Sequence, residues 1–344
     1  MSASSTSKRK RRRKSSNLRY RVVCAILAVI IVGVAGVLMY RQVMAQRGFD
    51  VAIGNQVDVG TGYRQIEYNG KKYRYNDRIT TIVYAGLDAE DALEVSSQYT
   101  LAPRADSISV IVMDDYHSRM SIIALSRDTM TEIHKYTLNG RDRGPFVDHL
   151  GYAYTYGEGG RVSGMNLCKA ISDLLGGVPV RNYVVSSRGS IPMIADAIGP
   201  VEVVVPNDDL SERGFSKGET VVIDGSNLET FIRSRETAED LSNTGRMERQ
   251  RAYIEAAIGK LTDYFTTKSS SAWDTMLKAE GCVQTNITRN HYLDLTKTLR
   301  NTAFDEDAYY MPLGQNVVGA DYDEFYPDRE RLRELVVDLF YIEQ

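Results

Sequence analysis

Apolar and polar positions follow one another along the chain in blocks that predict a mixed α/β fold. Short runs dense in β-branched and apolar residues predict strands at 80–88, 107–113, 120–125, 182–187, 201–206, 219–223 and 307–312. Apolar residues at helical spacing predict helices at 162–175, 188–198, 226–232, 246–265, 271–280, 290–300 and 328–341. Because strands and helices alternate, we expect one domain over 80–344, a three-layer α/β/α sandwich with a mixed sheet.

Residues 41–79 are expected to form a linker and a β-hairpin in front of this domain. The stretch GYRQIEYNGKKYRYN alternates tyrosines with polar residues around the pair Asn69-Gly70. Such a pair accepts the positive φ angles of a type I′ turn. We expect the hairpin to pack at an edge of the main domain and to carry no chemistry.

An uncharged run of 19 residues, Val22 to Tyr40, precedes the linker and is long enough to cross a bilayer as a helix. Residues 1–21 carry nine Lys or Arg and no acid, so they are expected to stay as a basic cytoplasmic tail. We interpret 22–40 as a transmembrane signal anchor. A cleaved signal peptide is the alternative, but its apolar region would be shorter, and MYRQVMAQRG offers a poor cleavage site.

The net charge of −3 conceals an asymmetry between the tail and the remainder of the chain. Without the first 21 residues, 33 basic residues face 45 acidic ones, which gives −12. That charge argues against nucleic acid as a partner. Cys168 and Cys282 could pair or remain two buried free thiols. The four histidines lack the spacing of a zinc motif.

Arginines gather in FIRSRETAEDLSNTGRMERQR, residues 231–251. Arg233 and Arg235 are two apart and would share one side of an extended segment. On a following helix, one face would hold Arg246, Arg249 and Gln250, after the expected cap or turn residues Asn243, Thr244 and Gly245. Guanidinium groups and a helix N-terminus together favour phosphate. Taken alone, the segment favours a solvated basic face paired with nearby acids.

Acidic and basic residues also stand at the ends of the predicted strands. Asp88 and Asp106 flank two strands, and Arg127 and Asp128 follow a third. Ligand groups in open α/β sheets gather at strand ends. Each aspartate alone fits an ordinary turn carboxylate, so only the joint pattern favours a site.

Three separated motifs in this order resemble the LytR-CpsA-Psr family, over roughly Thr80 to Lys260. They are RADSISVIVM…ALSRDT, YVVSSRGSIPMIADAIGPVEVVVP and RSR…NTGRMERQ. The family consists of signal-anchored proteins, mainly of Gram-positive bacteria, that attach glycopolymers to the cell wall. The N-terminal anchor predicted here is of the type expected for that family.

The resemblance implies a role for individual residues of this chain. Asp88 and Asp106 would hold Mg²⁺. The pyrophosphate of a polyprenyl-linked substrate would be contacted by Arg127, Arg233, Arg235, Arg246 and Gln250, with supporting contacts from Arg104 and Arg249. The catalytic residues would be Asp106, Arg127 and Arg246. Two carboxylates form a hard oxygen site that suits Mg²⁺, and positioned charges are the main requirement of phosphoryl transfer.

Two positions depart from the family pattern. The family's acidic residue three places before the arginine of the last motif is Asn243 here, so a carboxylate proposed there as metal ligand or base is missing. The usual Asn before the family's AYAYG run corresponds to Gly151 in GYAYTYG. Both departures bear on substrate type or rate more than on the class of reaction.

The resemblance therefore implies a Mg-dependent phosphotransferase that moves a glycopolymer from a polyprenyl-pyrophosphate carrier to peptidoglycan. The protein would be anchored in the cell membrane by a single span. Its N-terminus would lie in the cytoplasm, and its catalytic domain would lie outside the cell. A polyprenyl-pyrophosphate hydrolase, a membrane-bound transcriptional attenuator and a non-catalytic glycan-binding module are the alternatives. The lipid chain would need an apolar groove, for which Val110, Val112, Ile122, Met165–Leu175 and Tyr253–Leu261 are candidates, although core packing is the better explanation of each one alone.

Overall fold

A computed structural model describes residues 63–234, 243–278, 281–319 and 322–344. The predicted basic tail (1–21), membrane span (22–40) and linker up to residue 62 lie outside these residues. No helix in the described part of the chain is both long and apolar enough to cross a bilayer. The chain divides into two units, Met1–Asp58 and Val59–Gln344, and the second carries the fold described below.

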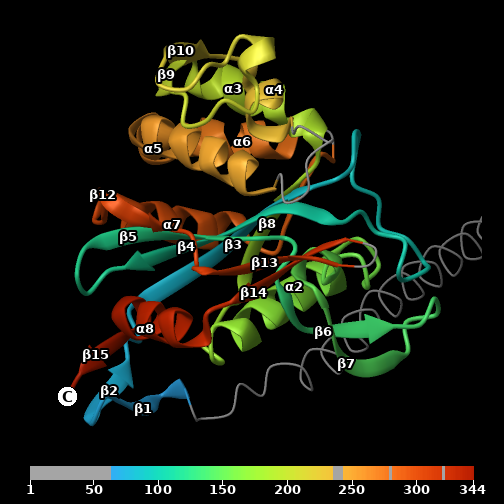
Figure 1. The fold of residues 1–344 in the computed structure, drawn as a ribbon, viewed down its shortest axis with the longest axis vertical. Helices are drawn as coiled ribbons and strands as arrows, with labels where there is room; N and C mark the ends of the chain where they lie inside the picture. The colour runs from blue at the N-terminus through green and yellow to red at the C-terminus, as the bar shows by residue number, and fades with distance from the viewer. Residues whose placement is uncertain (1–62, 235–242, 279–280, 320–321) are drawn as a thin grey trace, which may run out of the picture. The chain divides into compact units, whose positions relative to one another are not determined.

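A six-stranded mixed sheet forms the centre of the second unit (Figure 1). Its strand order is β11 (Val283–Thr285), β8 (Asn182–Ser186), β3 (Ile79–Leu87), β4 (Ala105–Asp114), β5 (Arg119–Leu125) and β12 (Ala303–Tyr310). β4 pairs antiparallel with both β3 and β5, whereas β8 runs parallel to β3 and β12 parallel to β5. The mixed sheet expected from the sequence is confirmed.

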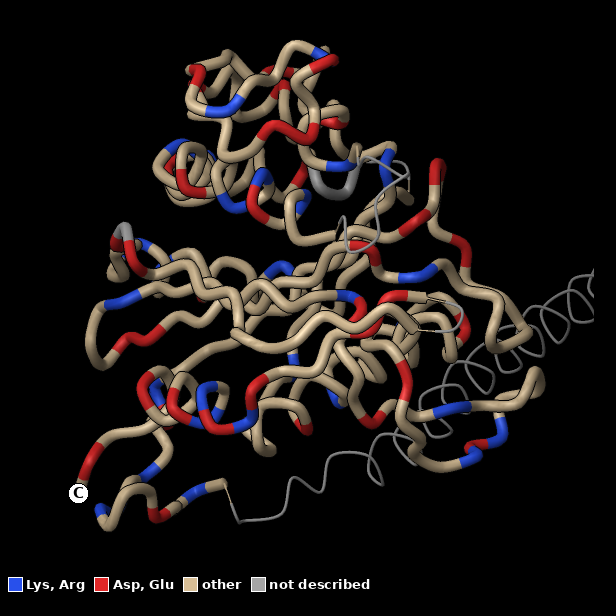
Figure 2. The backbone as a smooth tube through the Cα atoms, viewed as in Figure 1, with Lys and Arg blue, Asp and Glu red and all other residues tan. Residues whose placement is uncertain are grey.

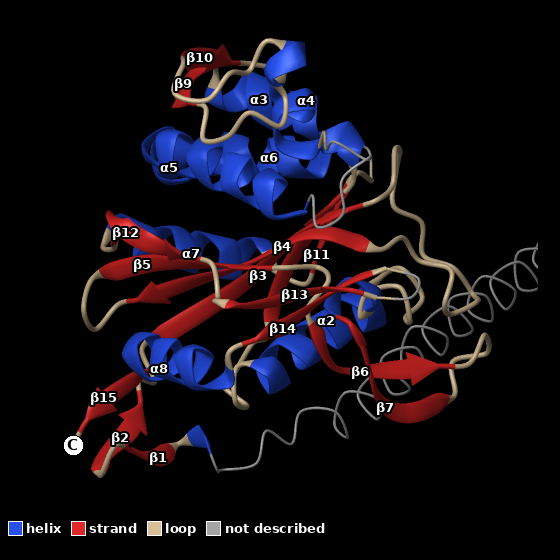
Figure 3. Cartoon of the chain, in the orientation of Figure 1, coloured by secondary structure: helices blue, strands red, loops and turns tan. Residues whose placement is uncertain are grey.

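Helices cover both faces of this sheet (Figure 3). On one face, α2 (Arg161–Leu174) and α8 (Arg329–Phe340) share a core with Val110 and Val112 of β4. On the other, α5 (Asn243–Thr267), α6 (Ser269–Lys278) and α7 (Arg289–Arg300) pack over Met113 and Ile122. Successive residues of a strand point to opposite faces, which is why one strand supplies both cores.

A smaller cluster packs on the outer side of α5. It contains the hairpin of β9 (Val201–Val204) and β10 (Thr220–Ile223), with α3 (Ile191–Ile198) and α4 (Leu228–Arg233). Its fully buried Phe231 lies 5.2 Å from Phe215, measured between ring centroids. This cluster fixes the end of α4, where Arg233 stands.

Three hairpins surround the sheet. β1 (Gln65–Tyr68) and β2 (Lys71–Tyr75) turn through Asn69 and Gly70, whose φ angles of 50° and 74° confirm the predicted turn. They continue into β15 (Tyr341–Glu343) as a separate small sheet. Two further pairs were not predicted: β6 (Met130–Tyr136) with β7 (Asp142–His149), and β13 (Gly314–Val318) with β14 (Asp323–Pro327).

The missed strands carry polar residues at exposed positions, so they lack the apolar run of a buried strand. β7 contains Gly144 and Pro145, and all five residues of β13 are exposed. No element was predicted within residues 136–160, where β7 lies.

Lys and Arg residues alternate with Asp and Glu along the described helices and hairpins (Figure 2). In this view the two signs are interspersed over most of the molecule. The concentration of arginines described next is therefore a local feature of one edge of the sheet.

Candidate functional site

Two aspartates lie at one edge of the central sheet because β3 and β4 pair antiparallel. β3 ends at Leu87, whose partner is Ala105, the first residue of β4. The backbone N–H of Asp88 donates to the carbonyl of Arg104 at 2.8 Å. The side chain of Asp88 is 52% exposed, whereas that of Asp106 is only 12% exposed. Asp88 therefore stands at the mouth of the site and Asp106 at its base.

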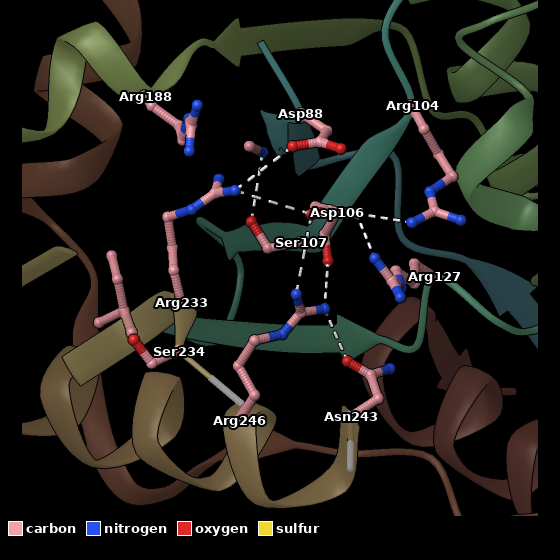
Figure 4. A network of polar contacts seen from close by, with 12 residues as sticks. Asp88, Arg104, Asp106, Ser107, Arg127, Arg188, Arg233, Ser234, Asn243 and Arg246 are labelled. Atoms are coloured by element: carbon pink, nitrogen blue, oxygen red, sulfur yellow. Dashed lines mark hydrogen bonds and ion pairs between the residues drawn. The ribbon is translucent and has the colours of Figure 1, made fainter. Parts of the chain in front are cut away.

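Four arginines converge on the carboxylate of Asp106 (Figure 4). Arg127 donates from Nη1 to Oδ1, and Nη2 of Arg104 lies 3.4 Å from the same oxygen. Nη1 of Arg246 and Nη2 of Arg233 lie 3.8 and 3.9 Å from Oδ2. Arg246 also donates from Nη2 to the backbone carbonyl of Asp106 at 2.7 Å. One buried anion thus faces cations from four separate segments of the chain.

The charge balance of this cluster sets the ionisation of Asp106. Burial of the carboxyl opposes its ionisation, but the positive charges of Arg127 and Arg246, with the Arg127 hydrogen bond, outweigh that effect and lower the pKa of Asp106. The carboxylate therefore stays charged at neutral pH. Asp106 neutralises one guanidinium charge, and Asp128, Asp88 and Glu229 pair with Arg127 and Arg233 around it.

Arg233 joins the two aspartates. Its Nη2 lies 3.4 Å from Oδ1 of Asp88 and 3.9 Å from Oδ2 of Asp106. The expectation that Arg233 lies in an extended segment is wrong, because Arg233 is the last residue of α4. Arg235 lies outside the described residues.

A second layer holds Arg127 and Arg246 in place. Oδ1 of Asn243 accepts a hydrogen bond from Nη2 of Arg246 at 2.6 Å, and its Nδ2 donates to Oδ2 of Asp128 at 2.9 Å. The other oxygen of Asp128 accepts from Nε of Arg127 at 3.2 Å. Asn243, Thr244 and Gly245, expected before the helix, belong to α5 itself. The neutral amide of Asn243 therefore links two of the site's arginines through Asp128.

Gln250 contacts α4, and Arg249 contacts the end of α4 together with the loop that carries Asn207 and Asp209. The buried guanidinium of Arg249 donates to Oδ2 of Asp209 at 2.7 Å and to Oδ1 of Asn207 at 3.0 Å. It also donates to the carbonyls of Phe231, at 3.0 Å, and Ser234. Nε2 of Gln250 donates to the carbonyl of Ile232 at 3.0 Å. These two residues fix the end of α4 that carries Arg233.

One residue of the site was missed by the sequence analysis. Arg188 begins the short 3-10 helix η3 (Arg188–Ser190) directly after β8 and lies beside Arg233 and Asp88 (Figure 4). Its Nη2 lies 3.1 Å from Oε1 of Glu90, and its buried Nε has no hydrogen-bond partner among the described residues. Because β8 is parallel to β3, both strands end at the same edge, and this placement was a signal that could have identified it.

Gly151, the second departure noted in the sequence, fills a position where any side chain would collide. A Cβ atom there would lie 2.8 Å from the carbonyl oxygen of Ala105 and 3.3 Å from Cβ of Arg127. The backbone N–H of Gly151 donates to the carbonyl of Arg127 at 2.9 Å. Gly151 therefore lets the chain pack directly against the two segments that supply Asp106 and Arg127.

Asp88 and Asp106 supply oxygen atoms of the kind that a hard divalent cation binds. Nη2 of Arg233 lies within 3.9 Å of both carboxylates and stands between them. Mg²⁺ binds one or two carboxylates and completes its shell with water and phosphate oxygens. Among the described residues, no three or more His, Cys, Asp or Glu side chains gather as a metal site. Other ligands of such an ion would come from water and substrate.

Three of the candidate groove residues and Cys168 belong to the packed interior. Val110 is fully buried, and Val112 and Ile122 are 2% and 6% exposed. Core packing therefore explains these three candidates. Cys168 is buried and Cys282 partly buried, and both are free thiols, so the paired alternative is not adopted.

The fold and this cluster define an α/β domain whose sheet edge presents a buried carboxylate among guanidinium groups. The chain belongs to the LytR-CpsA-Psr family, since the family's LytR_cpsA_psr profile matches residues 47–335. The chain is 27% identical over 213 residues to the polyisoprenyl-teichoic acid–peptidoglycan teichoic acid transferase TagU of Bacillus mycoides. That match covers 61% of this chain and 63% of the relative, so it spans less than two thirds of the relative's length.

Solved structures share the fold at lower sequence identity. A protein of Streptococcus agalactiae, 17% identical, superposes with a TM-score of 0.59 and covers 76% of this chain and 86% of its own. The structure described as TagT bound to LI-WTA, 19% identical, superposes with a TM-score of 0.55 and covers 82% of this chain and 97% of its own. The α/β architecture expected from the sequence is thus shared with other members of the family's fold.

Proposed function

We propose that this protein transfers a glycopolymer from a polyprenyl-pyrophosphate carrier to peptidoglycan and forms a phosphodiester link. The observation that carries the proposal is the convergence of Arg104, Arg127, Arg233 and Arg246 on Asp106. A diphosphate carries about two to three negative charges near neutral pH, and guanidinium groups bind phosphate oxygens through charge-assisted hydrogen bonds. The family membership and the printed name of TagU support the same class of reaction.

In the proposed step, a sugar hydroxyl of peptidoglycan attacks the phosphorus atom next to the glycan. A new P–O bond forms to that hydroxyl oxygen, and the P–O bond to the bridging oxygen breaks. The polyprenyl phosphate leaves with that oxygen, and the hydroxyl proton passes to a base. Arg127 and Arg246 stabilise the charge that develops on the phosphoryl oxygens, because their guanidinium groups are already positioned and buried.

The geometry favours Asp88 over Asp106 as the proton acceptor. The positive charges of the arginines lower the pKa of Asp106, which makes its carboxylate a weak base. Asp88 is half exposed at the mouth, where an acceptor hydroxyl would arrive. Asp106 then serves to orient the arginines.

We include Mg²⁺ in the proposal, held by Asp88 and Asp106. When bound, the ion would neutralise phosphate charge and polarise a phosphoryl oxygen. We further propose that residues 22–40 anchor the chain in the cell membrane and leave the domain outside the cell. A membrane anchor would raise the effective concentration of a lipid-linked substrate.

A polyprenyl-pyrophosphate hydrolase would use the same cluster with water as the acceptor. A regulator would need no catalysis and would tolerate loss of Arg246. No observation at the site favours either of these over transfer to a sugar hydroxyl.

The test is a transfer assay with the full-length chain, polyprenyl-pyrophosphate oligosaccharide, peptidoglycan and Mg²⁺. Arg246→Ala is expected to lower turnover by roughly 10- to 100-fold, as the loss of a charge-assisted phosphate contact should. Arg251→Ala is the matched control on the same helix, since Arg251 is exposed and pairs with Glu255. Free sugar phosphate without a wall-linked product would indicate hydrolysis, and turnover unchanged in Arg246→Ala would overturn the proposed site.

A further inference from the structure

A patch of aromatic side chains lies beside the arginine cluster and has no role in the step proposed above. It consists of Phe146, His149, Tyr152, Tyr156 and Tyr322, and we call it the aromatic patch. The rings touch in sequence: Phe146 lies 5.4 Å from Tyr156, Tyr156 lies 6.4 Å from Tyr152, and Tyr152 lies 6.4 Å from Tyr322, measured between centroids. His149 lies 5.9 Å from Tyr152 and 6.1 Å from Tyr322.

Arg104 connects the aromatic patch to Asp106. Its guanidinium carbon lies 5.6 Å from the centroid of the Tyr152 ring, and its Nη2 lies 3.4 Å from Oδ1 of Asp106. One side chain therefore touches both the buried carboxylate and the first ring of the patch. A ligand with its diphosphate at Asp106 would have the next groups of its structure beside Tyr152.

The aromatic patch is built from three segments and is open to solvent. Phe146 belongs to β7, Tyr152 ends the 3-10 helix η2 (Leu150–Tyr152), and Tyr322 precedes β14. Tyr322 is 56% exposed, and Phe146, Tyr152 and Tyr156 are each partly exposed. Exposed rings in a contiguous group mark a binding surface more often than isolated ones do.

Polar groups are interleaved with the rings of the patch. Oδ1 of Asp148 lies 2.9 Å from Nδ1 of His149, and the Tyr156 hydroxyl donates to its Oδ2 at 3.5 Å. Nε2 of His149 lies 3.0 Å from the carbonyl oxygen of Asp323. An aliphatic chain laid on this surface could not hydrogen-bond the carboxylate or the phenol hydroxyls that it covers, which is costly.

A pyranose ring matches this combination of groups. It presents a face of C–H bonds, which packs on the electron-rich face of an aromatic ring, and a rim of hydroxyls, which needs donors and acceptors. Tyrosine supplies a rigid apolar ring and a polar end in one side chain. The patch therefore has the chemistry of a carbohydrate subsite.

We propose that the aromatic patch binds sugar rings next to the reacting phosphate, with Tyr152 and Tyr322 as the stacking surfaces. The proposal rests on the proposed function in that it takes the arginine cluster as the diphosphate subsite. The sugars have two possible sources, which share this chemistry. They are the first residues of the donor glycan, or the acceptor strand of the wall.

The experiment measures dissociation constants of the full-length chain, purified in detergent, for three soluble probes. Farnesyl pyrophosphate reports the diphosphate subsite alone. A farnesyl-pyrophosphate-linked disaccharide adds donor sugars, and chitotetraose, an uncharged chain of N-acetylglucosamine, represents the acceptor. Each probe is titrated into the wild type, Tyr152→Ala and Tyr322→Ala. The matched control is Tyr116→Ala, since Tyr116 is 48% exposed beyond the far end of β4.

We expect each patch variant to weaken binding of at least one saccharide probe by roughly fivefold or more, the scale of one aromatic stacking contact. Binding of farnesyl pyrophosphate should change less than twofold, and Tyr116→Ala should match the wild type. A loss confined to the linked disaccharide assigns the patch to donor sugars, and a loss confined to chitotetraose assigns it to the acceptor.

Unchanged saccharide binding in both variants would overturn the inference, as would an equal loss for farnesyl pyrophosphate and its disaccharide. Tyr322 is 56% exposed, so Tyr322→Ala should fold normally. This variant therefore tests the inference even if Tyr152→Ala does not fold. Failure of the wild type to bind farnesyl pyrophosphate, with chitotetraose still bound through the patch, would instead count against the proposed function.

Discussion

The side-chain amide of Asn243 donates to Oδ2 of Asp128 at 2.9 Å, while its carbonyl oxygen accepts from Arg246 at 2.6 Å. Asn243 thus satisfies an anion on one side and a cation on the other. A carboxylate at this position could make only the second contact. The departure from the family pattern at residue 243 is therefore matched to the buried Asp128 beside it.

Replacing Asn243 by aspartate should destabilise the fold in a pH-dependent way. Two carboxylates within hydrogen-bond distance raise the pKa of the pair above its unfolded value. The folded state then binds more protons than the unfolded one, so stability falls as pH rises from about 4 through that raised pKa. We expect Asn243→Asp to lose roughly 1–3 kcal/mol at pH 7.5 relative to the wild type, and less at pH 4.5. Urea unfolding at both pH values measures this.

Asn243→Ala is the control, because it removes the hydrogen bonds and adds no charge. Its destabilisation should be the same at the two pH values. A pH-independent loss in Asn243→Asp would mean that Asp128 and the introduced carboxylate do not interact.

Asp106 should make stability fall in acid. Its pKa is lowered in the folded state, since the charges of Arg127 and Arg246 outweigh the effect of burial. A lowered pKa means that its contribution is present above the unfolded value of about 4 and is lost as pH falls through the folded value. Asp106→Asn should therefore unfold more readily at pH 7 and show a smaller further loss below pH 4 than the wild type. Thermal unfolding from pH 2.5 to 7 checks both points, and parallel curves for the two proteins would contradict the assignment.

Arg249 should act on the site through α4. Its side chain is fully buried and joins Asp209 to the carbonyls of Phe231 and Ser234. Arg249→Met should cost roughly 3–5 kcal/mol, as the breaking of a buried ion pair does, because Asp209 and the carbonyls lose their partner. Arg249 holds the end of α4 that carries Arg233. Loss of Arg249 should therefore displace Arg233, and the protein that still folds should show a raised KM for lipid-linked substrate. Arg251→Ala on the same helix should change neither unfolding nor KM.

Gly151→Ala should perturb the packing between Ala105 and Arg127. The added methyl would approach the Ala105 carbonyl to 2.8 Å, so the backbone must shift. We expect a loss of roughly 1–3 kcal/mol and a lower turnover, since the shift moves Asp106 and Arg127. Gly259→Ala is a matched control in α5, where nothing lies within 4 Å. It should stabilise by about 0.5–1 kcal/mol, and equal losses in both variants would contradict this account.

The sequence allowed the middle strands of the central sheet to be predicted because they are buried on both faces, whereas its edge strand β11 was not predicted. β3, β4 and β5 read as apolar runs, and their predicted bounds fall within two residues of those observed. Hairpins such as β6–β7 carry polar residues at exposed positions, so their strands were not predicted from apolar runs.

The candidate site was predicted in part. Asp88, Asp106 and Arg127 follow from strand ends, a local feature that the sequence displays. The different directions of Arg246 and Arg249 depend on helix phase relative to α4 and the sheet, which spacing alone does not specify. Arg188 escaped because its position near Arg233 is set by the pairing of β8 with β3, a long-range contact. The aromatic patch escaped for the same reason, since β7, η2 and the segment before β14 meet only in the folded chain.

The central claim is that distant arginines meet around a diphosphate. The most direct measurement is the dissociation constant of farnesyl pyrophosphate for the full-length chain and for Arg127→Ala, Arg233→Ala and Arg246→Ala, with Arg251→Ala as the control. We predict a loss of about tenfold or more in each of the three, since each removes a charge-assisted contact worth roughly 1.5–3 kcal/mol, and a value within twofold of the wild type for the control. Wild-type affinity in all three site variants would contradict the account.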